Sequence, residues 1–246
     1  MRVSLLQTDI QWAQPEENMK RAERLIEQCA GADLYVLPEM WATGFATTPM
    51  EVPINDEPLW WMQRMARQYC CALSGSLAVL TDGTYRNRHY FVTPDDVVFY
   101  DKHHLFTYGH EDEYFKPGNN HVVVEYKGVR ILLLTCYDLR FPVWARYGIA
   151  GLYDMIVVVA NWPESRQQAW SVLTLARAIE NQCFLVGVNR VGDDSFCHYA
   201  GGSLVCGPQG NTLIQCGNEE EAKSLELDFT SLEYVRSRFH VLDDRD

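Results

Sequence analysis

Three side chains that could take part in acyl transfer follow hydrophobic runs of the sequence. Glu39 closes DLYVLPE, Lys102 closes DVVFYDK, and Cys136 directly follows VRILLLT. A cysteine attacks as the thiolate, so it needs a base or a cation nearby. A glutamate can take the thiol proton and later activate water, while a lysine and a backbone N–H near Tyr137 can stabilise an oxyanion. Together these residue types predict nucleophilic catalysis at an acyl carbon.

Each of the three residues also has a simpler explanation. A glutamate after a strand is often a surface acid, a lysine in a loop is usually solvated, and most free cysteines are small buried hydrophobic residues. The eight cysteines include no C-x-x-C pair, and a chain of 246 residues does not depend on a disulfide framework. The catalytic interpretation therefore depends on the three residues occurring together.

The segments that must position these residues alternate between helix-like and strand-like patterns. Apolar residues at three- and four-residue spacing predict helices, at residues 15–30, 57–70, 142–147 and 164–182. Runs rich in β-branched and aromatic residues predict strands, at residues 3–9, 33–39, 72–80, 85–93, 96–102, 121–127, 129–135, 154–161, 183–190, 201–207 and 211–216. Lys127 and Gly128 are expected to form a hairpin turn.

This alternation predicts an α/β layered fold in which helices cover a largely buried sheet or pair of sheets. Several strands follow one another between residues 72 and 135 without a helix, which favours two sheets packed face to face. Because no linker, repeat or low-complexity tract interrupts the chain, we expect one domain over residues 1–246. Ligands of such sheets bind where strands end, so the three reactive residues should meet there.

The composition narrows the choice of partners. A formal net charge of -12 argues against nucleic acid or an anionic membrane surface, since both require a basic patch. The content of 47% hydrophobic and 22% charged residues is typical of a soluble globular protein. No apolar stretch is long enough for a membrane span, and the first residues lack the pattern of a signal peptide. We therefore expect a cytoplasmic protein that acts on a small molecule.

The segments PEMWATGF, YDKHHLF and CYDLRFPVWAR resemble the three signature blocks of the nitrilase (carbon–nitrogen hydrolase) superfamily. ANWPESR, ARAIENQ, NRVG and GGSLVCGPQG match later blocks in order. The resemblance implies a four-layer αββα sandwich and a Glu-Lys-Cys triad at Glu39, Lys102 and Cys136. It also implies a second glutamate shortly before a Pro-Gly, for which GHEDEYFKPG offers Glu111 and Glu113. The family spacing favours Glu111.

One departure from the superfamily pattern points to a branch of it. Many relatives carry a glutamate after the proline of the RFP segment, whereas Val143 follows Pro142 here. This fits the bacterial omega-amidases that act on 2-oxoglutaramate, which the sequence resembles most. The resemblance implies hydrolysis of the ω-amide of a small 2-oxo acid through a Cys thioester, with no cofactor. The alternatives are another amidase, a nitrilase, a carbamoyl-amine hydrolase, or a catalytically silent binding protein on the same scaffold.

A 2-oxo acid substrate also needs a group that binds its carboxylate. Arg140 offers a bidentate partner four residues beyond the nucleophile, although it could instead form a salt bridge with Asp138. Arg166 is a second candidate. Further residues are expected to line the pocket: Asn161 and Trp162 at its rim, and Phe45 and Tyr114 over the acyl chain.

Other chemistries have less support. Nothing near Cys136 resembles the local signature of a Cys-His protease, and His198 is expected to be a solvated loop residue. No HExxH or paired Cys/His spacing predicts a metal site, and no Gly-rich phosphate loop follows the first strand. Members of the superfamily commonly pair, so the resemblance also implies a homodimer.

Overall fold

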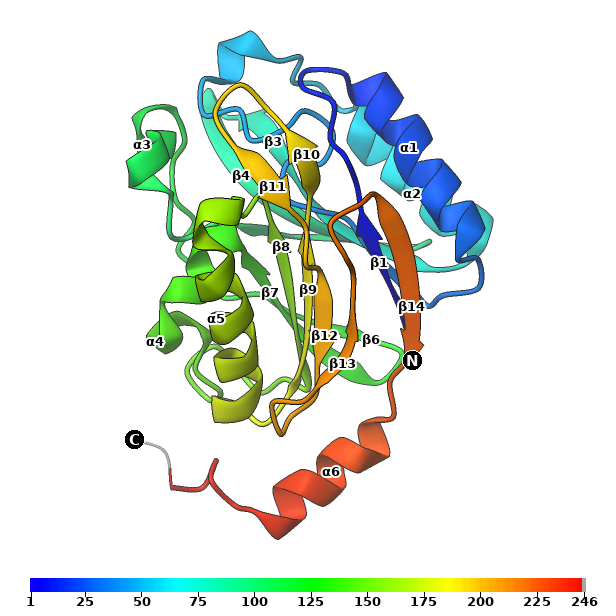
Figure 1. Cartoon of the computed structure of the whole chain (residues 1–246), viewed down its shortest axis with the longest axis vertical. Coiled ribbons are helices and arrows are strands. Elements are labelled where there is room, and N and C mark those ends of the chain that lie inside the picture. Colours follow the sequence, from blue (N-terminus) through cyan, green and yellow to red (C-terminus); the bar gives the residue numbers. More distant parts are fainter. Residues whose placement is uncertain (245–246) are drawn as a thin grey trace.

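The computed structural model describes residues 1–244 and contains two six-stranded sheets with helices on their outer faces (Figure 1). The first sheet has the order β14-β1-β2-β3-β4-β5, formed by β1 (Arg2–Gln7), β2 (Leu34–Val36), β3 (Ala72–Thr81), β4 (Thr84–Val92), β5 (Val97–Asp101) and β14 (Glu221–Glu226). The second has the order β13-β12-β9-β8-β7-β6, formed by β6 (Val123–Tyr126), β7 (Val129–Thr135), β8 (Met155–Ala160), β9 (Phe184–Asn189), β12 (Leu204–Cys206) and β13 (Thr212–Gln215). A small hairpin pairs β10 (Val191–Asp193) with β11 (His198–Ala200).

The helices complete two outer layers. The α-helices are α1 (Pro15–Gln28), α2 (Glu57–Tyr69), α3 (Glu111–Tyr114), α4 (Pro142–Ala145), α5 (Gln167–Glu180) and α6 (Phe229–Arg238). The described part of the chain also has four short 3-10 helices: η1 (Pro49–Glu51), η2 (Thr107–Gly109), η3 (Cys136–Arg140) and η4 (Glu164–Arg166). In Figure 1, α1 and α2 lie outside the first sheet, α4 and α5 lie outside the second, and α6 extends away from both.

Strand β7 shows how the layers are held together. Its residues Ile131 and Leu133 face the core between the two sheets, whereas Leu132 and Leu134 face α4 and α5. All four side chains are fully buried, which explains why the strand is a continuous apolar run and not an alternating one. A third core packs α1 and α2 against the first sheet. The four-layer αββα sandwich predicted from the sequence is therefore confirmed.

His89 of β4 connects the two sheets through polar contacts. Its Nδ1 lies 3.1 Å from the carbonyl oxygen of Leu134, and its Nε2 lies 2.7 Å from Ser74 Oγ. Because a carbonyl can only accept, Nδ1 carries the proton and Nε2 accepts from the serine hydroxyl. Burial lowers the pKa of His89 to about 3, so the imidazole stays neutral.

The structure confirms one predicted turn and adds a strand that was not predicted. Lys127 and Gly128 form the predicted hairpin turn with φ values of 50° and 77°, which is the geometry of a type I′ turn. The strand set, however, does not end at residue 216. Strand β14 follows and pairs antiparallel with β1 as an edge of the first sheet. None of its six residues is fully buried, so its sequence EAKSLE lacks the apolar run by which a strand could be predicted.

No helix among residues 1–244 combines the length and the apolar character that a membrane-crossing span requires.

Candidate active site

Strand ends from both sheets meet at one place and bring Glu39, Lys102 and Cys136 together. β2 and β3 are parallel. β4 is antiparallel to both β3 and β5, so β5 runs in the same direction as β2 and β3. Lys102 Nζ donates to Glu39 Oε1 at 2.8 Å. Glu39 and Lys102 are completely buried, and Cys136 is 9% exposed. The structure therefore places a carboxylate, an ammonium and a thiol in one largely buried cluster.

The structure places the two candidate second glutamates very differently. Glu111 is completely buried and accepts from Lys102 Nζ at 2.8 Å and from the Phe106 N–H at 2.7 Å. The Glu113 side chain is 57% exposed and pairs with His110 at the surface. Glu111 thus lies in the cluster and contacts the same ammonium as Glu39.

Asn87 was not singled out from the sequence, although it contacts both carboxylates. Its Nδ2 donates to Glu39 Oε1 at 2.8 Å and to Glu111 Oε1 at 2.9 Å. The N–H of Asn161 donates to the remaining oxygen, Glu39 Oε2, at 2.9 Å. Each carboxylate oxygen therefore accepts at least one hydrogen bond, as buried charges require. Asn87 lies in the middle of β4, where no local pattern marks it.

The electrostatics of the cluster assign protonation states. Burial lowers the pKa of Lys102, but the carboxylates of Glu111 and Glu39 more than compensate and raise that pKa well above its usual range. The lysine is thus a permanent cation. Burial and the nearby Glu39 carboxylate raise the pKa of the Cys136 thiol well above its usual range, against the lowering effect of Lys102. At neutral pH Cys136 is therefore a thiol that needs a base at the moment of attack.

The backbone turns sharply at Cys136, where β7 passes into η3. Its φ of 43° lies in the left-handed region, which is unfavourable for a residue with a side chain. The buried carboxylate of Asp138 holds this turn by accepting from the Thr135 N–H at 3.0 Å and the Tyr100 hydroxyl at 2.7 Å. It also accepts from the His104 N–H at 2.9 Å. Asp138 therefore connects the loop after β7 to the loop after β5.

A cavity of about 60 Å³ lies over the thiol, and Phe45, Asn161 and Trp162 line it together with Cys136. Asn161 and Trp162 are 5% and 2% exposed, so they form the cavity wall more than its rim. A larger cavity of about 720 Å³ lies next to it and shares Phe45 with it. Tyr114 lines this outer cavity and not the inner one.

Arg140, Arg166 and Tyr137 line the same inner cavity. Arg140 forms no ion pair among residues 1–244, so the salt bridge with Asp138 is not formed. The Arg140 guanidinium lies 4.8 Å from the centre of the Trp162 ring. Arg166 lines both cavities. Tyr137 lies in the first turn of η3, where the N–H has no acceptor within its own helix.

His198 lies at the surface, with its side chain 53% exposed and paired with Asp193. Within residues 1–244, the structure has no group of three or more His, Cys, Asp or Glu side chains arranged to hold a metal ion.

Comparisons with known proteins identify the family of the chain. The family model described as carbon-nitrogen hydrolase matches residues 2–236. The chain is 40% identical to omega-amidase YafV of Escherichia coli K12, over 100% of this chain and 97% of the relative. It is 34% identical to the 2-oxoglutaramate amidase of Bacillus subtilis, over 98% and 96% of the two chains.

Among solved structures, the fold is similar to that of a CN-hydrolase superfamily protein from Xanthomonas campestris with an arsenic adduct in its active site. The TM-score is 0.96 at 35% identity, covering 100% of this chain and 97% of that one. The chain therefore belongs to the carbon-nitrogen hydrolase family, whose members hydrolyse carbon–nitrogen bonds.

Proposed function

We propose that the protein hydrolyses the ω-amide of a small 2-oxo acid, 2-oxoglutaramate or 2-oxosuccinamate, to the dicarboxylate and ammonia. The observation that carries this proposal is the guanidinium of Arg140, which has no ion-pair partner among the described residues and lines the same small cavity as the Cys136 thiol. A partly buried cation without a counter-charge calls for an anionic ligand, because desolvation of the cation is otherwise uncompensated. The names of the omega-amidase and 2-oxoglutaramate amidase relatives support this substrate class.

In the proposed acylation step, Cys136 attacks the amide carbon while its proton passes to Glu39. The ammonium of Lys102 and the N–H of Tyr137 stabilise the oxyanion that forms on the amide oxygen. Glu39 then gives the proton to the leaving nitrogen, so the C–N bond breaks and ammonia departs. The product of this step is a thioester between Cys136 and the acyl group.

In the proposed deacylation step, Glu39 takes a proton from water as the water attacks the thioester carbon. As the C–S bond breaks, Glu39 returns this proton to the sulfur, so the thiol is regenerated and the acyl group leaves as the second carboxylate. Glu111 has no part in proton transfer. It accepts hydrogen bonds from Lys102 and the Phe106 N–H, and so it fixes the ammonium beside the reacting carbon. No cofactor enters the proposed reaction.

In this proposal, Arg140 recognises the substrate by binding its carboxylate, which lies at the end of the substrate opposite to the amide. A guanidinium presents two parallel N–H donors to a carboxylate. The Trp162 ring beneath Arg140 restricts where the guanidinium can lie. The buried Trp162 side chain and the Phe45 ring form apolar walls of the cavity. Once the substrate is bound, these walls exclude water, and the electrostatic contacts in the cavity become stronger.

A comparison of three substrates tests the proposal. Ammonia release is measured with 2-oxoglutaramate, glutamine and a simple aliphatic nitrile. Glutamine shares the ω-amide and carboxylate but carries an ammonium group near Arg140 in place of the oxo group. We expect 2-oxoglutaramate to have the highest kcat/KM. A higher value for glutamine or the nitrile would contradict the substrate assignment, and no turnover of any of them would favour a silent binding protein.

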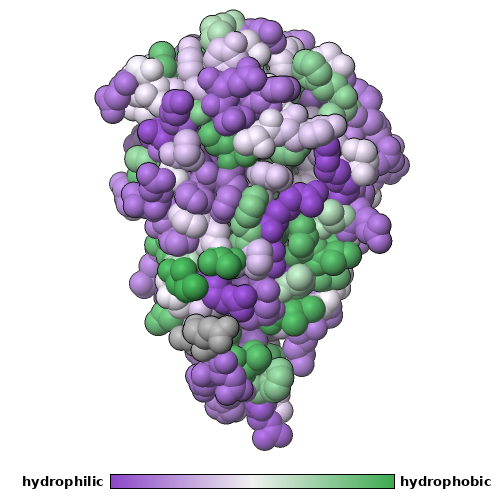
Figure 2. All heavy atoms as spheres, turned by 90° about the vertical axis from the view of Figure 1, so that its left-hand side faces the viewer, coloured by the Kyte–Doolittle hydropathy of each residue, from purple (hydrophilic) through white to green (hydrophobic). Residues whose placement is uncertain are grey.

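We also propose that the protein is a homodimer. Figure 2 shows apolar side chains gathered on the lower half of the face that carries α4 and α5, whereas the upper half is mainly hydrophilic. Five apolar residues of α4, of α5 and of the segment after α4 are between 49% and 66% exposed: Val143, Ile149, Leu152, Val172 and Ile179. Several large apolar side chains on one face of a highly charged protein are typical of an interaction surface. A second copy of this chain is the partner that the superfamily suggests.

A further inference from the structure

Lys102 follows β5, a strand at the edge of its sheet. Among residues 1–244, β5 pairs with β4 on one side and with no strand of its sheet on the other. The Lys102 N–H donates to the Asn87 carbonyl of β4 at 2.9 Å, and the Lys102 carbonyl accepts from the Gly118 N–H at 2.9 Å. The peptide groups around Lys102 are therefore held from both sides, and Gly118 replaces the strand that is absent on the outer side.

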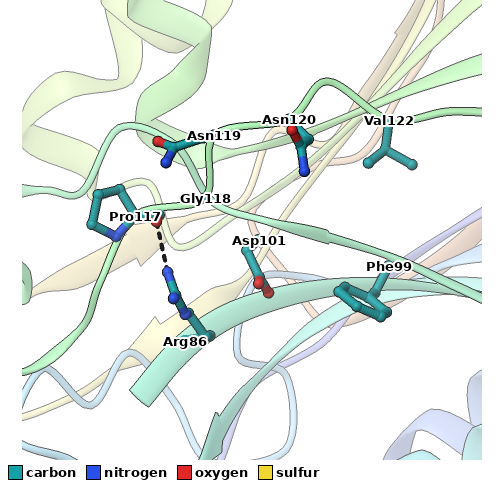
Figure 3. Close-up of a pocket in the computed structure, with 8 residues that line it drawn as sticks. All are labelled: Arg86, Phe99, Asp101, Pro117, Gly118, Asn119, Asn120 and Val122. Carbon is teal, nitrogen blue, oxygen red and sulfur yellow. Dashed lines mark hydrogen bonds between the residues drawn. The ribbon is translucent and has the colours of Figure 1, made fainter. Parts of the chain in front are cut away.

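The segment Lys116–Gly118, called the 116–118 strap below, is fastened to β4 by one side chain. Arg86 Nη1 donates to the Lys116 carbonyl at 3.0 Å and to the Pro117 carbonyl at 2.6 Å. Figure 3 shows the Arg86 side chain reaching Pro117, with Asp101 and Gly118 beside it. The Lys116 N–H also donates to the Tyr85 carbonyl at 3.0 Å. Arg86 is thus the side-chain link between the strap and the sheet.

Gly118 makes very close contact with the residues on either side of Lys102. A Cβ atom at Gly118 would lie 2.2 Å from the Asp101 carbonyl oxygen, so any side chain would force the two segments apart. The Gly118 carbonyl oxygen lies 2.6 Å from His103 Nδ1. The strap therefore touches the residue before Lys102 and the residue after it.

We infer that Arg86 and Gly118 are positioning residues, which set the location of the Lys102 ammonium through the 116–118 strap. Lys102 Nζ must stay within 2.8 Å of both Glu39 and Glu111. A displacement of its main chain that breaks one of these contacts also moves the charge away from the oxyanion. Misplacement of a catalytic group by about 1 Å can reduce the rate about 100-fold. This inference rests on the proposed role of Lys102.

The test compares arginines that hold loop carbonyls at different places. Arg86→Ala releases the strap, whereas Arg67→Ala is the matched control, since Arg67 Nε donates to the Pro94 carbonyl in the turn between β4 and β5. With whichever amide the wild type hydrolyses, we expect Arg86→Ala to lower kcat about 10-fold. The KM should stay within about twofold, and Arg86→Lys should recover part of the kcat. Arg67→Ala should leave kcat unchanged.

Gly118→Ala should lower kcat about 100-fold, because the added methyl group must displace the chain beside Lys102. If this variant does not fold, Arg86→Ala decides. A kcat of the Arg86 variant equal to that of the Arg67 variant, even with a lower Tm, would overturn the inference and leave the strap a purely structural element.

A second measurement does not depend on the substrate. The rate of Cys136 alkylation by iodoacetamide, followed by the mass of its peptide, reports the thiolate that Lys102 stabilises. We expect Arg86→Ala to slow this reaction several-fold and Arg67→Ala to leave it unchanged. Slower alkylation without amide turnover in the wild type would overturn the proposed function alone. Equal alkylation rates in both variants would overturn the positioning role.

Discussion

Replacing Glu111 with glutamine tests the contacts that hold the lysine in place. The carboxylate accepts from Lys102 Nζ and the Phe106 N–H at one oxygen, and from Asn87 Nδ2 at the other. All three partners are donors. A glutamine keeps one acceptor oxygen and replaces the other with an NH₂ group. At least one of the three buried donors must then point at this NH₂ group and has no acceptor. Asn87 cannot turn its amide around, because its oxygen would then face the carboxylate of Glu39.

The size of the effect follows from these contacts. A buried donor left without a partner costs about 1–3 kcal/mol, and loss of one of the two carboxylates around Lys102 adds to this cost. We expect the free energy of unfolding to fall by about 3 kcal/mol. A loss of about 2.7 kcal/mol in transition-state stabilisation corresponds to a factor of about 100 in rate. If the displaced ammonium stabilises the oxyanion less by this amount, kcat should fall about 100-fold.

The assay combines kcat for the ω-amide with urea unfolding, and Glu113→Gln is its control. Glu113 lies two residues further along the chain but pairs with His110 at the surface, so its variant should keep kcat within about twofold. A folded Glu111→Gln variant with wild-type kcat would refute the reasoning. An equal loss of activity in the Glu113 variant would also refute it.

Three further predictions concern parts of the molecule outside this contact. The pKa of His89 is about 3 in the folded protein against an ordinary value of 6.5, so the unfolded state binds the proton first and stability is lost as the pH falls through this window. Urea unfolding should lose about 2 kcal/mol between about pH 7 and about pH 5 from this group, and His89→Gln should flatten that slope. Arg140→Met should raise the KM of the 2-oxo acid amide at least about 30-fold, whereas the KM of a neutral amide should hardly change. Equal changes in KM for both substrates would exclude a contact between Arg140 and the carboxylate. If the proposed homodimer uses the face of α4 and α5, Val172→Glu should convert it to a monomer in light scattering, and an unchanged mass would place any interface elsewhere.

The sequence was sufficient to predict the layers and three of the residues that meet in the cluster. Each of these residues directly or closely follows a strand, and strand ends converge in this kind of sheet. The choice between Glu111 and Glu113 required the structure, because both lie within a few residues of the Pro-Gly. What decides it is burial, which depends on how α3 packs against the loop after β5.

Asn87 and Asp138 show why the rest of the site could not be predicted. Asn87 reaches both carboxylates only because the pairing of β4 with β5 sets it beside Lys102. Asp138 accepts from Tyr100 of β5 and from His104 in the loop after β5, both more than 30 residues away in the sequence. Neither contact leaves a local pattern in the sequence. Strand β14 was missed for a related reason, since the pairing with β1 joins the two ends of the chain.

The nucleophilic role of Cys136 is tested most directly by the rate of ammonia release from 2-oxoglutaramate in Cys136→Ala. Cys197→Ala is the matched control, because Cys197 lines the same inner cavity. The proposed mechanism predicts that Cys136→Ala loses at least about 10,000-fold in kcat, as expected when a covalent nucleophile is removed. The Cys197 variant should retain most of its activity. Full turnover by Cys136→Ala would contradict the proposed mechanism.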